Sequence, residues 1–213
     1  MLPYSSDILF TLIAEYNQDY RWVALLFLLS SVGVLFHQYR SHSVRWTLAL
    51  LGMGWIWIGL YYYYTLLNQL FFGAPYYGTV YIIAGSLLLF ASRRSEGEQR
   101  VTSTPGLNLW WYIIAFVSLA GFPLFDLMTQ NGVWPLRLPG MSPEPTLLFT
   151  LSIFGLYSRD LPVYVLILPV LTGLAEVYTI IALQHYASAL IPICSLLLLI
   201  QYFTNMDRRR SNH

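Results

Sequence analysis

Residues 46–69 read WTLALLGMGWIWIGLYYYYTLLNQ and contain no charged side chain. A helix needs about 20 consecutive apolar residues to cross the hydrocarbon core of a bilayer, and this run is long enough to do so. The rest of the chain has the same character. Of its 213 residues, 57% are hydrophobic and only 10% are charged, whereas soluble domains carry about 25% charged residues. The composition therefore predicts an integral membrane protein.

Apolar runs predict seven transmembrane helices, so the expected fold is an all-α membrane bundle. The predicted spans are residues 21–39, 46–69, 76–92, 108–129, 145–158, 162–184 and 187–205. The fifth span makes only about 18 Å of helix at ~1.5 Å per residue, less than the ~30 Å hydrocarbon core. It is either a full crossing in a thinned bilayer or a re-entrant half-helix. Because residues 21–206 are filled by spans and short loops, we expect no separate soluble catalytic or nucleic-acid-binding domain.

The arginines favour a full crossing of the fifth span. All 11 basic residues are arginines, and on the seven-span topology only Arg21 and Arg137 fall on the side of the N-terminus. The other side holds Arg40, Arg45, Arg93, Arg94, Arg100, Arg159, Arg208, Arg209 and Arg210. Basic residues are in excess on the cytoplasmic side of membrane proteins. We therefore expect the N-terminus outside and residues 207–213 as a cytoplasmic tail.

Residues 1–20 precede the first span and do not resemble a signal peptide, because they lack a basic start and carry acidic side chains. Leu9, Leu12 and Tyr16 share one face of a helix, whereas Glu15 and Gln18 fall on another. This amphipathic pattern predicts an interfacial helix lying on the outer leaflet. An ordered tail that packs on the bundle is the alternative interpretation.

Tyrosines and tryptophans gather near the ends of the predicted spans, as at Tyr61–Tyr64, Trp110 and Trp111. Aromatic side chains at these depths are typical of the belts at the two membrane–water interfaces. We expect such a belt here, and the alternative is that these rings line a ligand cavity.

Ionisable residues within or beside the spans form the candidate site, because a charge in hydrocarbon is costly. Glu176 lies inside the sixth span, Asp126 near the outer end of the fourth, and Glu144 at the start of the fifth. Arg137 and His185 fall in outer connections. Together they predict an outward-facing polar pocket for a cation, a proton or a small polar solute. The alternative is structural: Asp126 and Glu144 are interfacial residues, with Glu144 capping its helix, and Glu176 is a buried protonated or hydrogen-bonded group that ties two helices together.

The sequence also limits the cofactors. A retinal pigment needs a lysine for its Schiff base, and the chain has none. The single cysteine, Cys194, excludes an intramolecular disulfide and a cysteine-rich metal site. His37 and His185 are the metal or pigment candidates, but they fall near opposite faces, whereas a bis-histidine haem needs two ligands at one depth. Ligation of haem or chlorophyll by a single histidine is left open.

Common catalytic motifs are absent from the sequence, which has no G-x-S-x-G elbow, no H-E-x-x-H and no phosphate-binding glycine loop. We therefore expect no enzymatic activity. The favoured function is a membrane subunit that packs against another membrane protein or a second copy, and that holds lipid or pigment. The alternative is a small transporter or channel for a cation or polar solute, although the internal repeat typical of many transporters is not seen.

Several motifs resemble a bacterial polytopic membrane family that is described only as a domain of unknown function. They are PTLLFTL at 145–151, Leu161-Pro162 before a helix interrupted at Pro169, AEYN at 14–17 and WIWIG at 55–59. The resemblance extends over most of the chain. It implies a compact helical membrane domain, brings no established activity and points to no catalytic residue.

Overall fold

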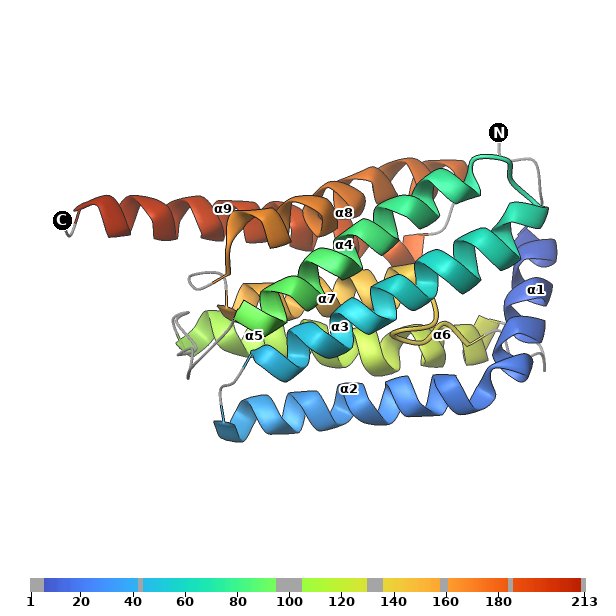
Figure 1. Ribbon diagram of the computed structural model, residues 1–213, viewed down its shortest axis with the longest axis horizontal. Coiled ribbons are helices and arrows are strands. Elements are labelled where there is room, and N and C mark those ends of the chain that lie inside the picture. Colours follow the sequence, from blue (N-terminus) through green and yellow to red (C-terminus); the bar gives the residue numbers. More distant parts are fainter. Residues whose placement is uncertain are drawn as a thin grey trace.

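The computed structural model describes residues 6–41, 44–94, 105–129, 136–157, 161–183 and 186–211. Within these ranges every regular element is a helix, so the predicted all-α class is confirmed. Most of the helices run side by side along the long axis of the molecule, and α1 lies across one end of this bundle (Figure 1). We refer to this end as the α1 end.

The helices coincide closely with the apolar runs of the sequence. They are α1 (Ser6–Asp19), α2 (Arg21–Ser41), α3 (Arg45–Trp57), α4 (Ala74–Arg94), α5 (Pro105–Phe116), α6 (Phe122–Thr129), α7 (Pro143–Tyr157), α8 (Val163–Leu183) and α9 (Leu190–Ser211). Shorter elements adjoin them: the π-helices η1 (Ile58–Leu66) and η3 (Val117–Gly121) and the 3₁₀-helices η2 (Leu67–Gln69) and η4 (Tyr186–Ala189). α3 continues directly into η1, and α5 continues through η3 into α6.

Two helices of the described ranges are long and apolar enough to cross a membrane: α4 and the continuous helix Leu109–Met128. The helices Thr11–Asp19 and Arg21–His37 pass the same test together, but they meet at 85°, so they form a third span only if it is a broken one. Val163–Tyr178 and Leu190–Asn205 are shorter apolar helices. The structure thus provides two or three candidate crossings, fewer than the seven that the sequence predicts.

α7, the short fifth span of the sequence analysis, lies at the centre of the bundle. It contacts α3, α5, α8 and α9, and every residue of it except Glu144 is buried. A helix that is enclosed by other helices does not face lipid, so the thickness of the bilayer does not set its length. This burial accounts for the shortness of α7, and its full crossing stays a prediction.

The residues predicted as a C-terminal tail continue a helix. The tail is predicted from residue 207, and α9 extends to Ser211, while the cytoplasmic place of these residues stays a prediction. This helix extends beyond its neighbours at the end of the bundle opposite α1 (Figure 1). α1 and the C-terminal end of α9 therefore lie at opposite ends, which is the arrangement that the predicted topology requires.

α1 is fastened to the bundle by polar contacts at the α1 end. The Asn17 side-chain amide donates to the Leu136 carbonyl at 2.6 Å, and the indole N–H of Trp57 donates to the Tyr16 hydroxyl at 2.7 Å. Tyr16 is only 4% exposed. The amphipathic helix predicted before the first span is therefore present and packs on the bundle, while its place at the outer leaflet stays a prediction.

α3 and α4 approach each other closely through paired glycines. A Cβ built at Gly52 would lie 2.8 Å from the Gly85 carbonyl oxygen, and one at Gly85 would lie 2.7 Å from that of Gly52. Gly59 and Gly78 repeat this arrangement two turns away, at 2.7 and 2.9 Å. Small residues allow such close contact between the backbones of two helices. In lipid the hydrophobic effect does not drive helices together, so their association depends on close packing of this kind.

Gly59→Ala should therefore destabilise the protein by about 1–3 kcal/mol, the usual cost of overpacking. The added methyl group would meet the Gly78 backbone, which cannot yield unless the two helices separate. Gly33→Ala is the matched control, because nothing lies within 4 Å of a Cβ at Gly33. Alanine has the higher helix propensity, so this control should be neutral or slightly stabilising. Thermal unfolding in detergent measures both variants, and equal midpoints would contradict the close approach of α3 and α4.

Candidate functional site

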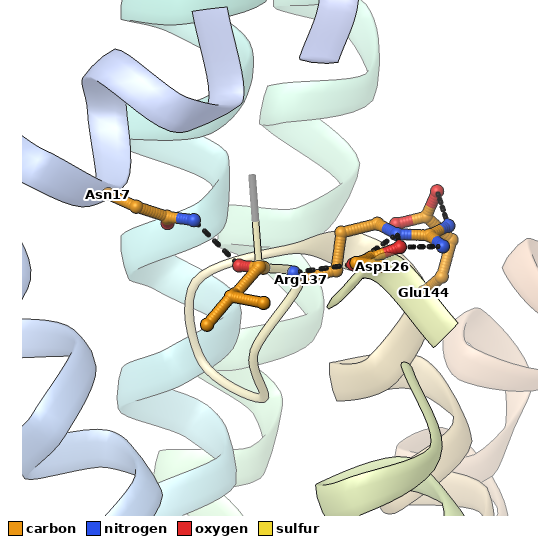
Figure 2. A network of polar contacts seen from close by, with 5 residues as sticks. Asn17, Asp126, Arg137 and Glu144 are labelled. Carbon is orange, nitrogen blue, oxygen red and sulfur yellow. Dashed lines mark hydrogen bonds and ion pairs between the residues drawn. The ribbon is translucent and has the colours of Figure 1, made fainter. Parts of the chain in front are cut away.

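A buried ion pair joins α6 to the segment that leads into α7. Arg137 Nη2 donates to Asp126 Oδ1 at 2.6 Å, and Arg137 Nε lies 3.1 Å from both carboxylate oxygens. The backbone N–H of Arg137 also donates to Asp126 Oδ2, at 2.9 Å (Figure 2). Both residues are only 1% exposed. One carboxylate thus fixes the backbone and the guanidinium of Arg137 together, with the multiple charge-assisted contacts of a strong pair.

Glu144 brings a second carboxylate to the same guanidinium. It lies in the first turn of α7, and its Oε1 is 3.7 Å from Arg137 Nη1 (Figure 2). Burial lowers the pKa of Arg137, but the attraction of Glu144 and the hydrogen bond to Asp126 outweigh burial, so the pKa is raised above its ordinary value. The guanidinium is therefore charged despite its burial. We call Asp126, Arg137 and Glu144 the Arg137 cluster.

The turn before α7 is shaped by its own sequence. Gly140 has a φ of +83°, a left-handed conformation that glycine adopts without strain. Its N–H donates to the Thr146 hydroxyl at 2.7 Å, and this hydroxyl donates to the Ser142 carbonyl at 2.6 Å. Pro143 begins α7, a position at which the missing N–H of proline costs nothing. The turn thus directs the first turn of α7 toward Arg137.

Glu176 of α8 is buried, with 8% of its surface exposed, so the side chain points into the bundle as the sequence predicts. It interacts electrostatically with Tyr63 of η1 and Tyr81 of α4, and Glu144 acts on the same two tyrosines. The rings of Tyr63 and Tyr81 lie 5.0 Å apart between centroids. Glu176 and Glu144 thus act electrostatically on the same pair of tyrosines.

The aromatic side chains of this region belong to the interior. Trp55 stacks on Tyr81 with 4.5 Å between ring centroids. Tyr62, Tyr63 and Trp111 are 3%, 9% and 2% exposed. The prediction that these three residues belong to an interfacial belt is wrong, because they lie on the helix faces that point into the bundle.

Both π-helices lie next to the site. η1 carries Tyr62 and Tyr63, and η3 directly precedes α6, which carries Asp126. π-helical turns are rare and are frequent at functional sites, where their wider turn redirects side chains.

An apolar groove lies beside the cluster, in the corner between α1 and α2. It has a volume of about 830 Å³, within the range of ~300–1,000 Å³ that is usual for ligand sites. One wall comes from α1 and α2, and the other from η3, α6 and the segment that carries Arg137. Its lining includes Ala14, Arg21, Ala24, Leu28, Leu119 and Leu138. Figure 1 shows α6 beside the corner that α1 and α2 form.

Comparison with known families gives a match over residues 6–211, to a family of unknown function named DUF6064. The chain belongs to DUF6064. The resemblance seen in the sequence motifs is thereby confirmed. No curated protein and no solved structure matches the chain.

The structure of this DUF6064 protein unites part of the predicted pocket. It brings Asp126, Arg137 and Glu144 into direct contact, and Glu176 shares with Glu144 an electrostatic influence on Tyr63 and Tyr81. The first three of these residues are engaged with one another in an ion-pair cluster, a role that the sequence did not predict. Binding of a cation or solute by the group remains a prediction.

The structure describes only one of the two histidine candidates. His37 is partly buried near the end of α2, while His185 lies outside the described residues. The haem or pigment prediction therefore stays untested. Among the residues that the structure describes, no three His, Cys, Asp or Glu side chains gather closely enough to hold a metal ion.

Sequence reasoning missed Tyr63 and Tyr81, the two tyrosines of this DUF6064 protein on which both carboxylates act electrostatically. A signal was present in Tyr61–Tyr64, four consecutive aromatic residues within one helix. Successive residues of a helix are about 100° apart around its axis, so four of them cannot share one face. At least one had to point toward the protein, and Tyr62 and Tyr63 do so.

Proposed function

We propose that this DUF6064 protein is a non-enzymatic integral-membrane subunit that packs against another membrane protein or a second copy of itself. It crosses the inner membrane of a bacterium seven times, with the N-terminus outside. Two or three candidate spans and two shorter apolar helices support the membrane location. The parallel arrangement of the long helices in Figure 1 is compatible with further crossings.

The Arg137 cluster is the observation that carries this proposal. Its guanidinium is 1% exposed, and its donors are directed at two carboxylates of the same chain. Arg137 is therefore used to hold α6 against the beginning of α7. A buried pair of this kind can specify one arrangement of packed elements, and we infer that its role here is structural.

The outer face of α2 offers a surface for the partner. Trp22, Leu26, Leu29 and Phe36 are 71%, 62%, 62% and 58% exposed. In a bilayer such a face packs equally well against lipid or against an apolar helix of another protein. We place the protein partner on this face of α2.

Extraction in a mild detergent, followed by mass spectrometry of the co-migrating proteins, tests the proposal. We expect a stoichiometric membrane-protein partner or a homo-oligomer. Leu26→Ala combined with Leu29→Ala should weaken this assembly, whereas the same change at Ile167 and Leu171 of α8, 47% and 56% exposed, is the matched control. A monomer without a stoichiometric partner would overturn the proposal, and an absorption spectrum of the same sample tests for haem or pigment.

The topology gives a separate prediction. Reporter fusions after residues 100 and 213 should both report the cytoplasm, because the excess of arginines lies on that side of the seven-span arrangement. A fusion after residue 73, between the second and third predicted spans, is the control and should report the outside. If the fusions after residues 100 and 213 report opposite sides, α7 is re-entrant and seven crossings are wrong.

A small transporter or channel for a cation or polar solute is the second candidate function. The buried Glu176 and the partly buried Glu144 favour it, because both carboxylates act electrostatically on Tyr63 and Tyr81. Acidic residues inside membrane segments commonly mark the paths of ions or protons. Pro169 lies inside α8, two turns before Glu176, and leaves a backbone carbonyl without its helical donor.

A further inference from the structure

We propose that the groove between the α1–α2 corner and α6 binds one acyl chain of an anionic phospholipid, whose phosphate contacts Arg21. This inference rests on the proposed function as a membrane subunit and specifies the lipid that the subunit holds. The groove is lined largely by Ala14, Ala24, Leu28 and Leu119. A groove of about 830 Å³ with this lining suits a hydrocarbon chain, with few polar groups to orient it.

Arg21 provides the charge that selects an anionic headgroup. It lines the groove where α1 meets α2, it is exposed, and the ion pairs of the described residues do not include it. Arg137, the other arginine predicted on this side, is already neutralised by Asp126. A guanidinium binds the oxygens of a phosphate with two parallel hydrogen bonds. Arg21 is thus a cation still available to a ligand at the mouth of an apolar groove.

Trp22 indicates the depth at which this arginine lies. The Arg21 Cζ atom is 5.4 Å from the centre of the Trp22 ring, and the Trp22 side chain is 71% exposed. Tryptophan is enriched at the level of the lipid headgroups. The neighbouring guanidinium therefore lies where a phosphate can reach it while the acyl chain enters the groove.

Asn17 adds a hydrogen-bond acceptor to the same groove. Its Nδ2 donates to the Leu136 carbonyl at 2.6 Å (Figure 2), which sets the orientation of the amide because a carbonyl oxygen can only accept. Its Oδ1 is buried and has no hydrogen-bond partner among the described residues. Buried polar atoms normally have a partner. The hydroxyl of phosphatidylglycerol can donate to this oxygen, whereas the trimethylated headgroup of phosphatidylcholine has no such donor.

Native mass spectrometry of the delipidated protein in detergent tests this inference, with phosphatidylglycerol and phosphatidylcholine titrated separately. The wild type should bind one phosphatidylglycerol more tightly than phosphatidylcholine. Arg21→Gln should weaken the binding of phosphatidylglycerol about tenfold, the factor expected for one charged hydrogen bond. Arg45→Gln is the matched control, because Arg45 also begins a helix and lies 5.8 Å from the ring of the next residue, Trp46, but does not line the groove.

A second variant tests the groove itself. Ala14→Phe should fill it and prevent the binding of both lipids, while far-ultraviolet circular dichroism shows that the helices are intact. Equal weakening by Arg21→Gln and Arg45→Gln would overturn the proposal, since the lipid would then bind through general surface charge. Retention of lipid by Ala14→Phe, or a co-purified hydrophobic molecule without phosphate in the groove, would also overturn it.

Partner assembly is measured on the same samples, so that the two proposals can fail separately. Arg21→Gln should lose the preference for phosphatidylglycerol and keep the protein partner, because Arg21 lies outside the set of α2 residues that form the proposed contact face. If the wild type assembles with its partner but does not prefer phosphatidylglycerol, the lipid site is wrong and the packing function stands. Lipid preference in a monomer without a partner would support the lipid site and overturn the packing function.

Discussion

Asp126→Asn should destabilise the protein by about 3–5 kcal/mol, the loss typical when one member of a buried ion pair is removed. Asparagine preserves the shape of the side chain but not its charge. Arg137, 1% exposed, would remain charged, and the new amide group would place donors beside the donors of the guanidinium. Chemical or thermal unfolding in detergent measures the loss. The change should also loosen the turn before α7, because the backbone N–H of Arg137 shares the same carboxylate.

Asp19→Asn is the matched control for this variant. Asp19 is the last residue of α1 and is exposed, and surface substitutions usually change stability by less than about 0.5 kcal/mol. If Asp126→Asn were as mild as this control, the cluster would not hold α6 and α7 together. The structural role proposed for Arg137 would then be wrong.

Replacing both partners gives a further test of the pair. Asp126→Leu combined with Arg137→Met removes both charges of the buried pair, so the double variant should be more stable than Asp126→Asn, although Glu144 loses its cation. Recovery should be incomplete, because the backbone N–H of residue 137 loses the acceptor that lies 2.9 Å away in the native protein. A thermodynamic cycle with both single variants gives the coupling energy of the pair.

The place of the Arg137 cluster along the chain could be inferred from the sequence, but its geometry could not. Asp126, Arg137 and Glu144 all border the ends of apolar runs on one side of the predicted topology, which brings them to a similar depth. Their contact depends on the left-handed turn at Gly140 and on the π-helical η3 before α6. A local change of helical pitch has no counterpart in hydropathy, so the direction of the carboxylate could not be read from the sequence.

The helices were easier to predict than their surroundings. Amphipathic spacing identified α1 because one of its faces is buried and the other is polar, as at Tyr16 and Glu15. α7 offers no such contrast, because a helix surrounded by apolar protein and a helix surrounded by lipid have the same composition. Its complete burial and the inward direction of Tyr62 and Trp111 therefore emerge only when the neighbouring helices are placed.

Glu176→Gln distinguishes the two candidate functions. It should abolish transport if the protein is a transporter or channel, and it should have no effect on transport if the protein is a packing subunit. Glutamine has nearly the same shape as glutamate and still forms hydrogen bonds, but it neither titrates nor binds a cation as a carboxylate does. For a packing subunit, we expect assembly to persist and stability to change by about 1 kcal/mol at most, the net contribution of one hydrogen bond. Glu15→Gln, on the exposed face of α1, is the control for removal of an acidic group.

Flux of protons and monovalent cations into vesicles reconstituted with wild type and Glu176→Gln completes this test. As a subunit, the wild type should conduct no more than empty vesicles, and the variant should behave in the same way. A wild-type flux that Glu176→Gln abolishes and Glu15→Gln spares would instead establish the transporter. Glu176 would then act together with Glu144, Tyr63 and Tyr81, because both carboxylates act electrostatically on these two tyrosines. Glu144→Gln should in that case reduce the flux as well, whereas a flux that neither substitution changes would place the pathway outside this pair of carboxylates.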